Sequence, residues 1–266
     1  IREGYRVNYF GVAIPDSVIP EHIICHVPLL ETDPLPNNWH ADTAEFAAAL
    51  RAVDLAQFSF TMIELGCGWC CWMNITGLCA RRKGLVVKLI GVEGDRHHLN
   101  LAEMSLKANG LAPGEYSLLH GIANASSGMA AFPQQNPGDS HWGLEPVFSH
   151  EKQKYRDALD TGKYAELPMI GFRELTAEVT HVDLLHVDIQ GGELLLVESC
   201  IETFSEKVAY IVIGTHSREI EGALFETFLK AGWLLEIERP ALLTLHETGP
   251  AIWVDGVEGW RNPRLT

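Results

Sequence analysis

Carboxylates and a histidine follow apolar runs of this sequence, and these residue types could bind a cationic ligand and move a proton. Glu93, Asp188 and His216 each come directly after an apolar, strand-like run. A carboxylate can hold an ammonium group or a pair of hydroxyls, and a histidine can take up a proton near neutral pH. If the runs are parallel strands, their carboxyl ends share one edge of a sheet, where such sheets bind ligands. The spacing therefore predicts one ligand site built from several strand ends.

A glycine turn follows another apolar run, in the segment Glu64-Leu65-Gly66-Cys67-Gly68-Trp69. Glycines between a strand and a helix let the backbone approach a ligand closely. A dinucleotide site would carry a third glycine where this chain has Cys71, and an acid before the turn disfavours a pyrophosphate. The acid favours a cationic cofactor such as S-adenosylmethionine, which has an ammonium and a sulfonium. An ordinary tight turn is the alternative.

Glu93 stands at the end of the next apolar run, one helix and one strand after the glycine turn. A carboxylate at this position can accept hydrogen bonds from both hydroxyls of a ribose. A solvated loop acid is the alternative interpretation. Glu93 and the glycine turn together favour a nucleoside cofactor more than either feature does alone.

Asp188 and His216 are the candidate catalytic residues, because they end two strands that we expect to be neighbours. His216 could deprotonate a hydroxyl, with Asp188 orienting it. Asp188 could instead cap the following helix, and His216 could bond to backbone at the start of a helix. The two side chains would be a thin ligand set for a hard divalent ion, so we expect no metal.

Strand-like and helix-like segments alternate along most of the chain, which predicts an α/β fold with a doubly wound, mostly parallel sheet. The expected helices span 42–57, 72–82, 99–109, 192–204 and 220–231. The expected strands span 58–65, 85–92, 116–119, 182–187 and 208–213, with 233–237 and 251–254 as closing strands.

Two segments interrupt this alternation. Residues 1–40 are rich in proline and form an N-terminal extension, with short strands expected over 12–14 and 23–30, and residues 41–266 form the main domain. Residues 124–165 form an insertion, and an insertion of this length usually carries function or covers a site. Aromatic side chains in these regions could stack on a sugar or could simply pack: Trp39, Trp142 and Tyr155.

Composition limits the partners and the compartment. The chain has 20 Lys and Arg against 35 Asp and Glu, a net charge of −15, which disfavours nucleic acids and anionic membranes. We expect a cytoplasmic protein, because no apolar run has the length of a membrane span and no signal peptide opens the sequence. Only one cluster of cysteines is present, so reduced thiols are expected rather than a zinc site. Oligomeric state stays open.

From about Asp42 to Glu238 the chain resembles the FkbM family of methyltransferases. The resemblance rests on Glu64 to Trp69, Val92 to Asp95, Asp183 to Glu193, Gly214 to Ser217 and Gly232-Trp233. It implies a seven-stranded Rossmann-like methyltransferase sheet, S-adenosylmethionine as cofactor, and O-methylation of sugar or natural-product hydroxyls. The cofactor contacts that follow are Glu64, Gly66, Cys67, Gly68, Trp69, Glu93, Gly94, His120, Gly121, Ile122 and Asp188.

Two other functions compete with this expectation. An NAD-dependent oxidoreductase could use a similar sheet, but the missing third glycine argues against it. A non-catalytic binding module could keep the fold, but three carboxylates at strand ends, Glu64, Glu93 and Asp188, argue against that. The expected partner is a small hydroxylated molecule.

Overall fold

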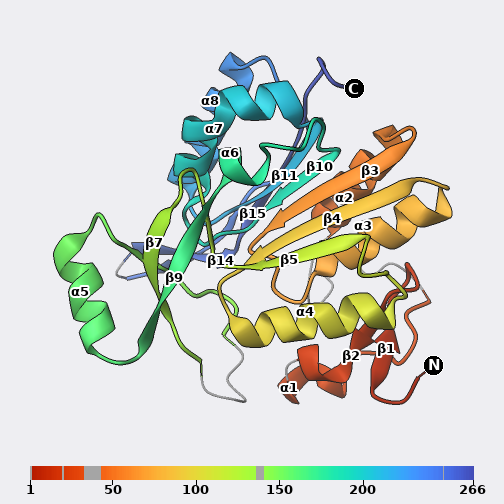
Figure 1. The fold of residues 1–266 in the computed structure, drawn as a ribbon, viewed down its shortest axis with the longest axis horizontal. Coiled ribbons are helices and arrows are strands. Elements are labelled where there is room, and N and C mark those ends of the chain that lie inside the picture. The colour runs from red at the N-terminus through yellow and green to blue at the C-terminus, as the bar shows by residue number, and fades with distance from the viewer. Residues whose placement is uncertain (1, 20, 33–42, 136–140, 248) are drawn as a thin grey trace.

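A seven-stranded sheet forms the centre of the computed structural model, which describes residues 2–19, 21–32, 43–135, 141–247 and 249–266 (Figure 1). Its strand order is β12-β15-β11-β10-β3-β4-β5, and the pairs from β11 to β5 are all parallel. The strands are β3 (Ser59–Leu65), β4 (Val86–Glu93), β5 (Tyr116–His120), β10 (Leu184–Val187), β11 (Tyr210–Thr215), β12 (Leu234–Arg239) and β15 (Gly256–Arg261). The doubly wound, mostly parallel sheet expected from the sequence is confirmed.

Helices cover both faces of this sheet (Figure 1). One face carries α2 (Thr43–Leu55), α3 (Cys71–Arg82) and α4 (Arg96–Ala108), and the other carries α6 (Phe172–Leu175), α7 (Glu193–Lys207) and α8 (Arg218–Lys230). Neighbouring strand residues therefore pack into different cores: Met62 lies with α2 and α3, whereas Ile63 lies with α7. Burial on both faces explains why the strands are continuous apolar runs rather than alternating ones.

The closing strand of the sheet is β15, which the sequence did not predict. It runs antiparallel between β11 and β12. Its sequence, Gly-Val-Glu-Gly-Trp-Arg, does not look like a buried strand, yet Glu258 is 1% exposed and accepts a hydrogen bond from the Trp260 indole at 2.7 Å. Gly259 is required because a Cβ there would lie 2.9 Å from the Tyr210 hydroxyl. The expectation that 251–254 closes the sheet is wrong.

Residues 251–254 instead belong to a separate two-stranded sheet. β14 (Gly249–Val254) pairs antiparallel with β13 (Leu242–His246). This hairpin leaves the main sheet after β12 and returns to it at β15. We call these two strands the β13–β14 arm.

The N-terminal extension forms a small hairpin beside α4. β1 (Tyr5–Val7) pairs antiparallel with β2 (Ala13–Pro15), and a 3-10 turn η1 (Asp16–Val18) and α1 (Glu21–Ile24) follow. The strand expected over 12–14 is confirmed in β2, but the one expected over 23–30 is wrong because its first residues are helical. The Asn109 side chain, at the end of α4, accepts from the Ala13 amide at 2.7 Å and donates to its carbonyl at 3.0 Å. The boundary expected near residue 40 lies outside the described residues.

The insertion builds a second sheet to one side of the first (Figure 1). Its strand order is β6-β9-β7-β8, from β6 (Ile122–Asn124), β7 (Gly128–Pro133), β8 (Val147–Phe148) and β9 (Tyr164–Gly171), and α5 (Lys152–Asp160) lies between β8 and β9 in the chain. Across the described residues, no helix combines the length and the apolar character needed to cross a membrane.

Candidate active site

A cavity of about 440 Å³ opens at the carboxyl ends of β3, β4 and β10. The turns after β3 and β4, the segment after β5 and the turn after β10 contribute to its walls, and the insertion contributes the rest. Among the residues predicted from the sequence, its lining includes Gly66, Gly68, Glu93, Gly94, Gly121, Ile122 and Asp188. Segments that are far apart in the sequence thus form one site, at the edge of the sheet where the sequence placed it.

The glycine turn after β3 passes against the end of β10. Gly66 has φ +74°, and a Cβ there would lie 1.9 Å from the Asp188 carbonyl oxygen. The amides of Gly66 and Cys67 both donate to the Val92 carbonyl at 3.0 Å, which ties the turn to β4. Only glycine fits at position 66, because any side chain would push the ends of β3 and β10 apart.

Glu93 connects the turn after β3 to the turn after β4. One carboxylate oxygen accepts from the Gly68 amide at 2.9 Å, and the other accepts from the Asp95 amide at 2.7 Å. Each oxygen can still accept another hydrogen bond, since a carboxylate oxygen has two lone pairs. Glu93 is 9% exposed and lines the cavity, so these two bonds fix a carboxylate that faces a ligand.

Glu64 lies beneath the turn and is not among the residues that line the cavity, so its contact with a cofactor stays a prediction. Its carboxylate accepts from the amides of Trp72 at 3.3 Å and Met73 at 2.9 Å, at the start of α3. The residue before this helix, Cys70, has φ 63° and no side-chain capping bond, so Glu64 supplies the cap from the neighbouring strand. Burial raises the pKa of Glu64 to about 7.

The other predicted residues outside the lining are also buried or bonded elsewhere. Cys67 and Trp69 are 3% and 6% exposed and pack into the core on the α3 side of the sheet. His120 places one ring nitrogen 2.9 Å from the Gly94 carbonyl and the other 2.8 Å from the Arg96 guanidinium. His120 therefore fastens the turn after β4, while Gly121 and Ile122 after it line the cavity.

His216, the predicted base, lies between two carboxylates. Its Nε2 is 3.3 Å from Asp188 Oδ1, and its Nδ1 is 3.0 Å from Glu193 Oε1. Glu193 is fully buried, and the same oxygen accepts from the amides of Ile189 at 3.1 Å and Gly191 at 3.2 Å. Glu193 thus shapes the turn that carries Asp188 and holds the histidine beside it.

The charge state of His216 follows from these neighbours. Burial alone lowers the pKa of its imidazole, but Asp188 and Glu193 outweigh burial and raise the pKa to about 10. His216 in turn lowers the pKa of Asp188, although burial acts in the opposite direction. An imidazolium has no free lone pair, so at neutral pH His216 does not fit the predicted role of base. It holds Asp188 as a carboxylate at the cavity wall.

The same three side chains are the metal-ligand candidates among the described residues. Asp188, Glu193 and His216 each offer one ligand atom, and these atoms lie within 4.8 Å of one another. Glu193 joins the Asp188 and His216 pair that the sequence suggested. The imidazolium already supplies the positive charge that a cation would bring to the two carboxylates, so the cluster does not require a metal for charge balance.

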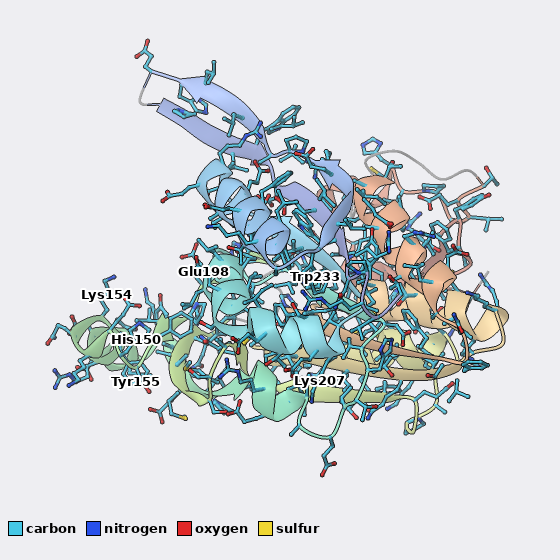
Figure 2. The ribbon with its side chains drawn as sticks, turned by 90° about the horizontal axis from the view of Figure 1, so that it is seen from above. His150, Lys154, Tyr155, Glu198, Lys207 and Trp233 are labelled. Carbon is cyan, nitrogen blue, oxygen red and sulfur yellow. The ribbon has the colours of Figure 1, made fainter. Side chains whose placement is uncertain are left out.

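The insertion covers the site with an aromatic ring. Trp142 stacks on His98 with ring centroids 4.0 Å apart and an interplanar angle of 4°. The same ring lies over Gly68, where a Cβ would be 3.2 Å from it. Tyr155 lies on α5 away from the cavity, with its hydroxyl donating to Glu166 (Figure 2). Trp39 lies outside the described residues.

A relative in sequence shows the family of this chain. A protein of Jannaschia sp. (strain CCS1) named "Putative methyltransferase" is 40% identical over 262 residues, which cover 98% of this chain and 94% of that protein. This chain belongs to the same methyltransferase family. No family model matches the sequence.

Two solved methyltransferase structures resemble this chain at low sequence identity. The methyltransferase FkbM from Methylobacillus flagellatus KT is 15% identical with a TM-score of 0.48, over 78% of this chain and 45% of that chain. The precorrin-6Y C5,15-methyltransferase from Geobacter metallireducens GS-15 is 9% identical with a TM-score of 0.46, over 81% of this chain and 85% of that chain.

The walls of the cavity in this methyltransferase are acidic and apolar. Its lining carries Glu93, Asp95, Asp188 and Asp255, and no Lys or Arg among the described lining residues. The sequence did not single out Asp255, which follows the β13–β14 arm. Its pKa is raised by burial, with the nearby Asp188 and Glu193 acting in the same direction and His216 against it. Acidic walls fit a cofactor that carries an ammonium and a sulfonium. Gly66, which has no side chain, exposes its own backbone to the cavity.

Proposed function

We propose that this methyltransferase uses S-adenosylmethionine to methylate a hydroxyl of a neutral sugar or natural-product-like small molecule. The observation that carries the proposal is the convergence of Gly66, Glu93 and Asp188 on one cavity at the carboxyl ends of the sheet. When bound, the cofactor supplies the methyl group on a sulfonium leaving group.

Three parts of the lining account for three parts of the cofactor. Glu93 keeps acceptor capacity on both oxygens, which suits a pair of ribose hydroxyls. The uncovered backbone at Gly66 and Gly68 suits the amino-acid end, beside the carboxylate of Asp188. Gly121 and Ile122, after β5, suit the base. The site residues of this proposal are therefore those that line the cavity, and Glu64, Cys67 and Trp69 support them from below.

We assign Asp188 as the residue that accepts the proton of the acceptor hydroxyl. The cofactor would supply the methyl group and the leaving sulfur, and Gly66, Glu93 and Asp188 would hold it. Asp188, an ionised carboxylate at the cavity wall, would accept the proton that the acceptor hydroxyl loses. His216 positions Asp188 and keeps it ionised until then. Excluding water is the task of the ring of Trp142.

The acceptor is proposed to be uncharged because the walls repel anions. Four carboxylates and the absence of Lys and Arg among the described lining residues disfavour phosphate or carboxylate groups. Phe132, Trp142 and Phe148 give the insertion side of the cavity an apolar surface that suits the face of a ring. The net charge of −15 makes a nucleic acid a poor partner for the same reason.

The first experiment is calorimetric titration with S-adenosylhomocysteine, the product form of the cofactor. We expect micromolar binding, and binding at least tenfold weaker in Glu93→Ala, since both carboxylate contacts are lost. Glu198→Ala, on the exposed surface of α7, is the matched control and should bind as the wild type does (Figure 2). NAD should not bind. A folded wild-type protein that does not bind S-adenosylhomocysteine would refute the proposal. Binding of the cofactor without turnover of any hydroxylated molecule would favour a non-catalytic binding module.

A further inference from the structure

The β13–β14 arm extends away from the rest of the molecule. Figure 2 shows it as the blue ribbon that projects at the top of the view, beyond the helices and the central sheet. Its two strands pack mainly on each other and belong to neither of the two larger sheets. A two-stranded ribbon by itself is only marginally stable in water, and both of its edges leave backbone groups unpaired. This arm therefore needs a covering partner more than any other described part of the chain.

One face of the arm is apolar and the other is mixed. The pairs Leu243–Ile252 and Leu245–Pro250 share the apolar face, whereas Leu242–Val254 lies on the other face with Thr244 and His246. Leu245 is 82% exposed, Trp253 is 73% exposed and Leu242 is 45% exposed. An exposed apolar surface of this kind on a soluble protein marks an interaction site or an aggregation hazard. Neither strand carries an acidic or basic group apart from His246, and Glu247 lies in the turn that follows β13.

The base of the arm is fixed, so the arm is presented at a set angle. The Ala241 amide, just before β13, donates to the buried carboxylate of Glu221 at 2.6 Å. The Thr215 hydroxyl donates to the same oxygen at 3.1 Å. Gly256, just after β14, packs closely against the Glu221 carboxylate and the Thr215 hydroxyl. A Cβ at this position would lie 2.1 Å from an oxygen of each side chain. A preorganised surface loses little entropy when it binds.

We propose that the arm is the interface of a homodimer, in which it packs against the arm of a second copy about a two-fold axis. A surface with almost no charge needs no oppositely charged partner, and a two-fold dimer would bring the same apolar face of both copies together. Nucleic acids and anionic lipids would require basic residues, which the described arm residues lack.

The projection of the arm also answers the strongest objection to self-association. Each copy carries a net charge of −15, so two bodies repel at short range. Strands of five and six residues span about 17–20 Å, whereas charges are screened beyond about 8 Å at physiological salt. Contact at the arms therefore joins the copies while their acidic bodies stay beyond the range of strong repulsion.

The available area fits a weak dimer. The exposed fractions of Leu243 and Leu245, which share the apolar face, correspond to on the order of 250 Å² of apolar surface. Two arms in contact by this face would then bury roughly 500 Å² of leucine surface, which is below the size of a standard interface. We therefore expect a dimer that dissociates on dilution rather than an obligate one.

Sedimentation velocity of the full chain tests the inference without reference to methyl transfer. We expect twice the 29.5 kDa chain mass at concentrations of about 100 µM and dissociation on dilution. A Leu245→Ser/Trp253→Ser variant should dissociate at least tenfold more readily, because the two most exposed apolar side chains of the arm are lost. Its far-UV spectrum should be unchanged, since neither residue belongs to a core. Phe58→Ser removes an 86% exposed side chain elsewhere and is the matched control, which should dimerise as the wild type does.

Two outcomes would overturn the inference. One is a wild-type protein that stays at the mass of one chain at about 100 µM. The other is a Leu245→Ser/Trp253→Ser variant that dimerises as tightly as the wild type. A monomer whose arm binds phosphatidylcholine vesicles, with loss of binding in the same variant, would assign the arm to a lipid surface instead. Binding of S-adenosylhomocysteine by the same protein samples tests the proposed function independently of the oligomeric state.

Discussion

Replacing His216 should expose how strongly the buried Glu193 depends on a positive charge. In His216→Asn the Glu193 carboxylate, 0% exposed, loses the cation 3.0 Å away, while the amides of Ile189 and Gly191 stay in place. Breaking a buried ion pair by removing one partner costs about 3–5 kcal/mol. The rise in the pKa of His216 from 6.5 to about 10 corresponds to roughly 5 kcal/mol at most, and relaxation and its partial exposure reduce it. We expect His216→Asn to lower the free energy of unfolding by about 3 kcal/mol at pH 7.5.

The effect should depend on pH in a defined direction. The pKa of His216 is higher in the folded chain than in the unfolded one, so its stabilisation is complete below about pH 6.5 and is lost as the pH rises through about 10. The difference in unfolding free energy between wild type and His216→Asn should therefore shrink between pH 7.5 and pH 10.5.

Urea unfolding of a double-mutant cycle measures this interaction. His216→Asn, Glu193→Gln and the double variant give a coupling free energy that we expect to exceed about 1 kcal/mol, since the double variant no longer buries an unpaired charge. The exposed pair Glu226–Lys230 on α8 is the matched control, and its cycle should show no resolvable coupling. A coupling free energy below about 0.5 kcal/mol between His216 and Glu193, or a wild-type advantage that does not change up to pH 10.5, would refute the reasoning.

Further predictions concern the cavity. Gly66→Ala should abolish binding of S-adenosylhomocysteine in calorimetry, because its Cβ would lie 1.9 Å from the Asp188 carbonyl oxygen. Gly68→Ala should still bind measurably, because its Cβ would meet only the Trp142 ring, at 3.2 Å. Trp142→Ala should raise the KM of the acceptor about tenfold with a smaller change in cofactor affinity, as rate measurements at saturating cofactor can show. Dialysis against EDTA should leave the turnover rate unchanged, whereas a loss that Mg²⁺ or Mn²⁺ restores would assign Asp188, Glu193 and His216 to a metal. A phosphorylated analogue of any accepted substrate should react at least tenfold more slowly than the uncharged substrate, because the acidic walls repel it. The Asp255→Asn variant, which removes one carboxylate from the lining, should reduce this difference in rate.

Much of the fold was predictable because the strands of a sheet covered on both faces are continuous apolar runs. Six of the seven strands of the central sheet, and the five long helices expected from the sequence, lie within a few residues of their observed places. The seventh strand, β15, was not expected because Glu258 and two glycines make it look unlike a buried strand. Gly259 is explained only by the nearby Tyr210 and Ala48, and Glu258 by its hydrogen bond with Trp260.

The positions of several site residues were predictable from the sequence, whereas the roles of others were not. Strand ends placed Glu93, Asp188 and Gly66 correctly at one cavity, since parallel strands end at a common edge. The roles of Glu64 and His216 were not readable, because each depends on a contact between separate segments. Glu64 accepts hydrogen bonds from α3 amides eight and nine residues away, and His216 meets Glu193 at the start of α7.

The position of β15 has a consequence for synthesis of this protein on the ribosome. β11 and β12 flank β15 and leave the ribosome before it, so during translation they lie near each other with a strand-wide gap between them. At about 5–20 residues per second, that gap lasts for seconds before residues 256–261 can fill it. Until then the nascent chain carries two open strand edges next to an unfinished core containing Trp233. Binding of a chaperone to this half of the nascent sheet would protect it.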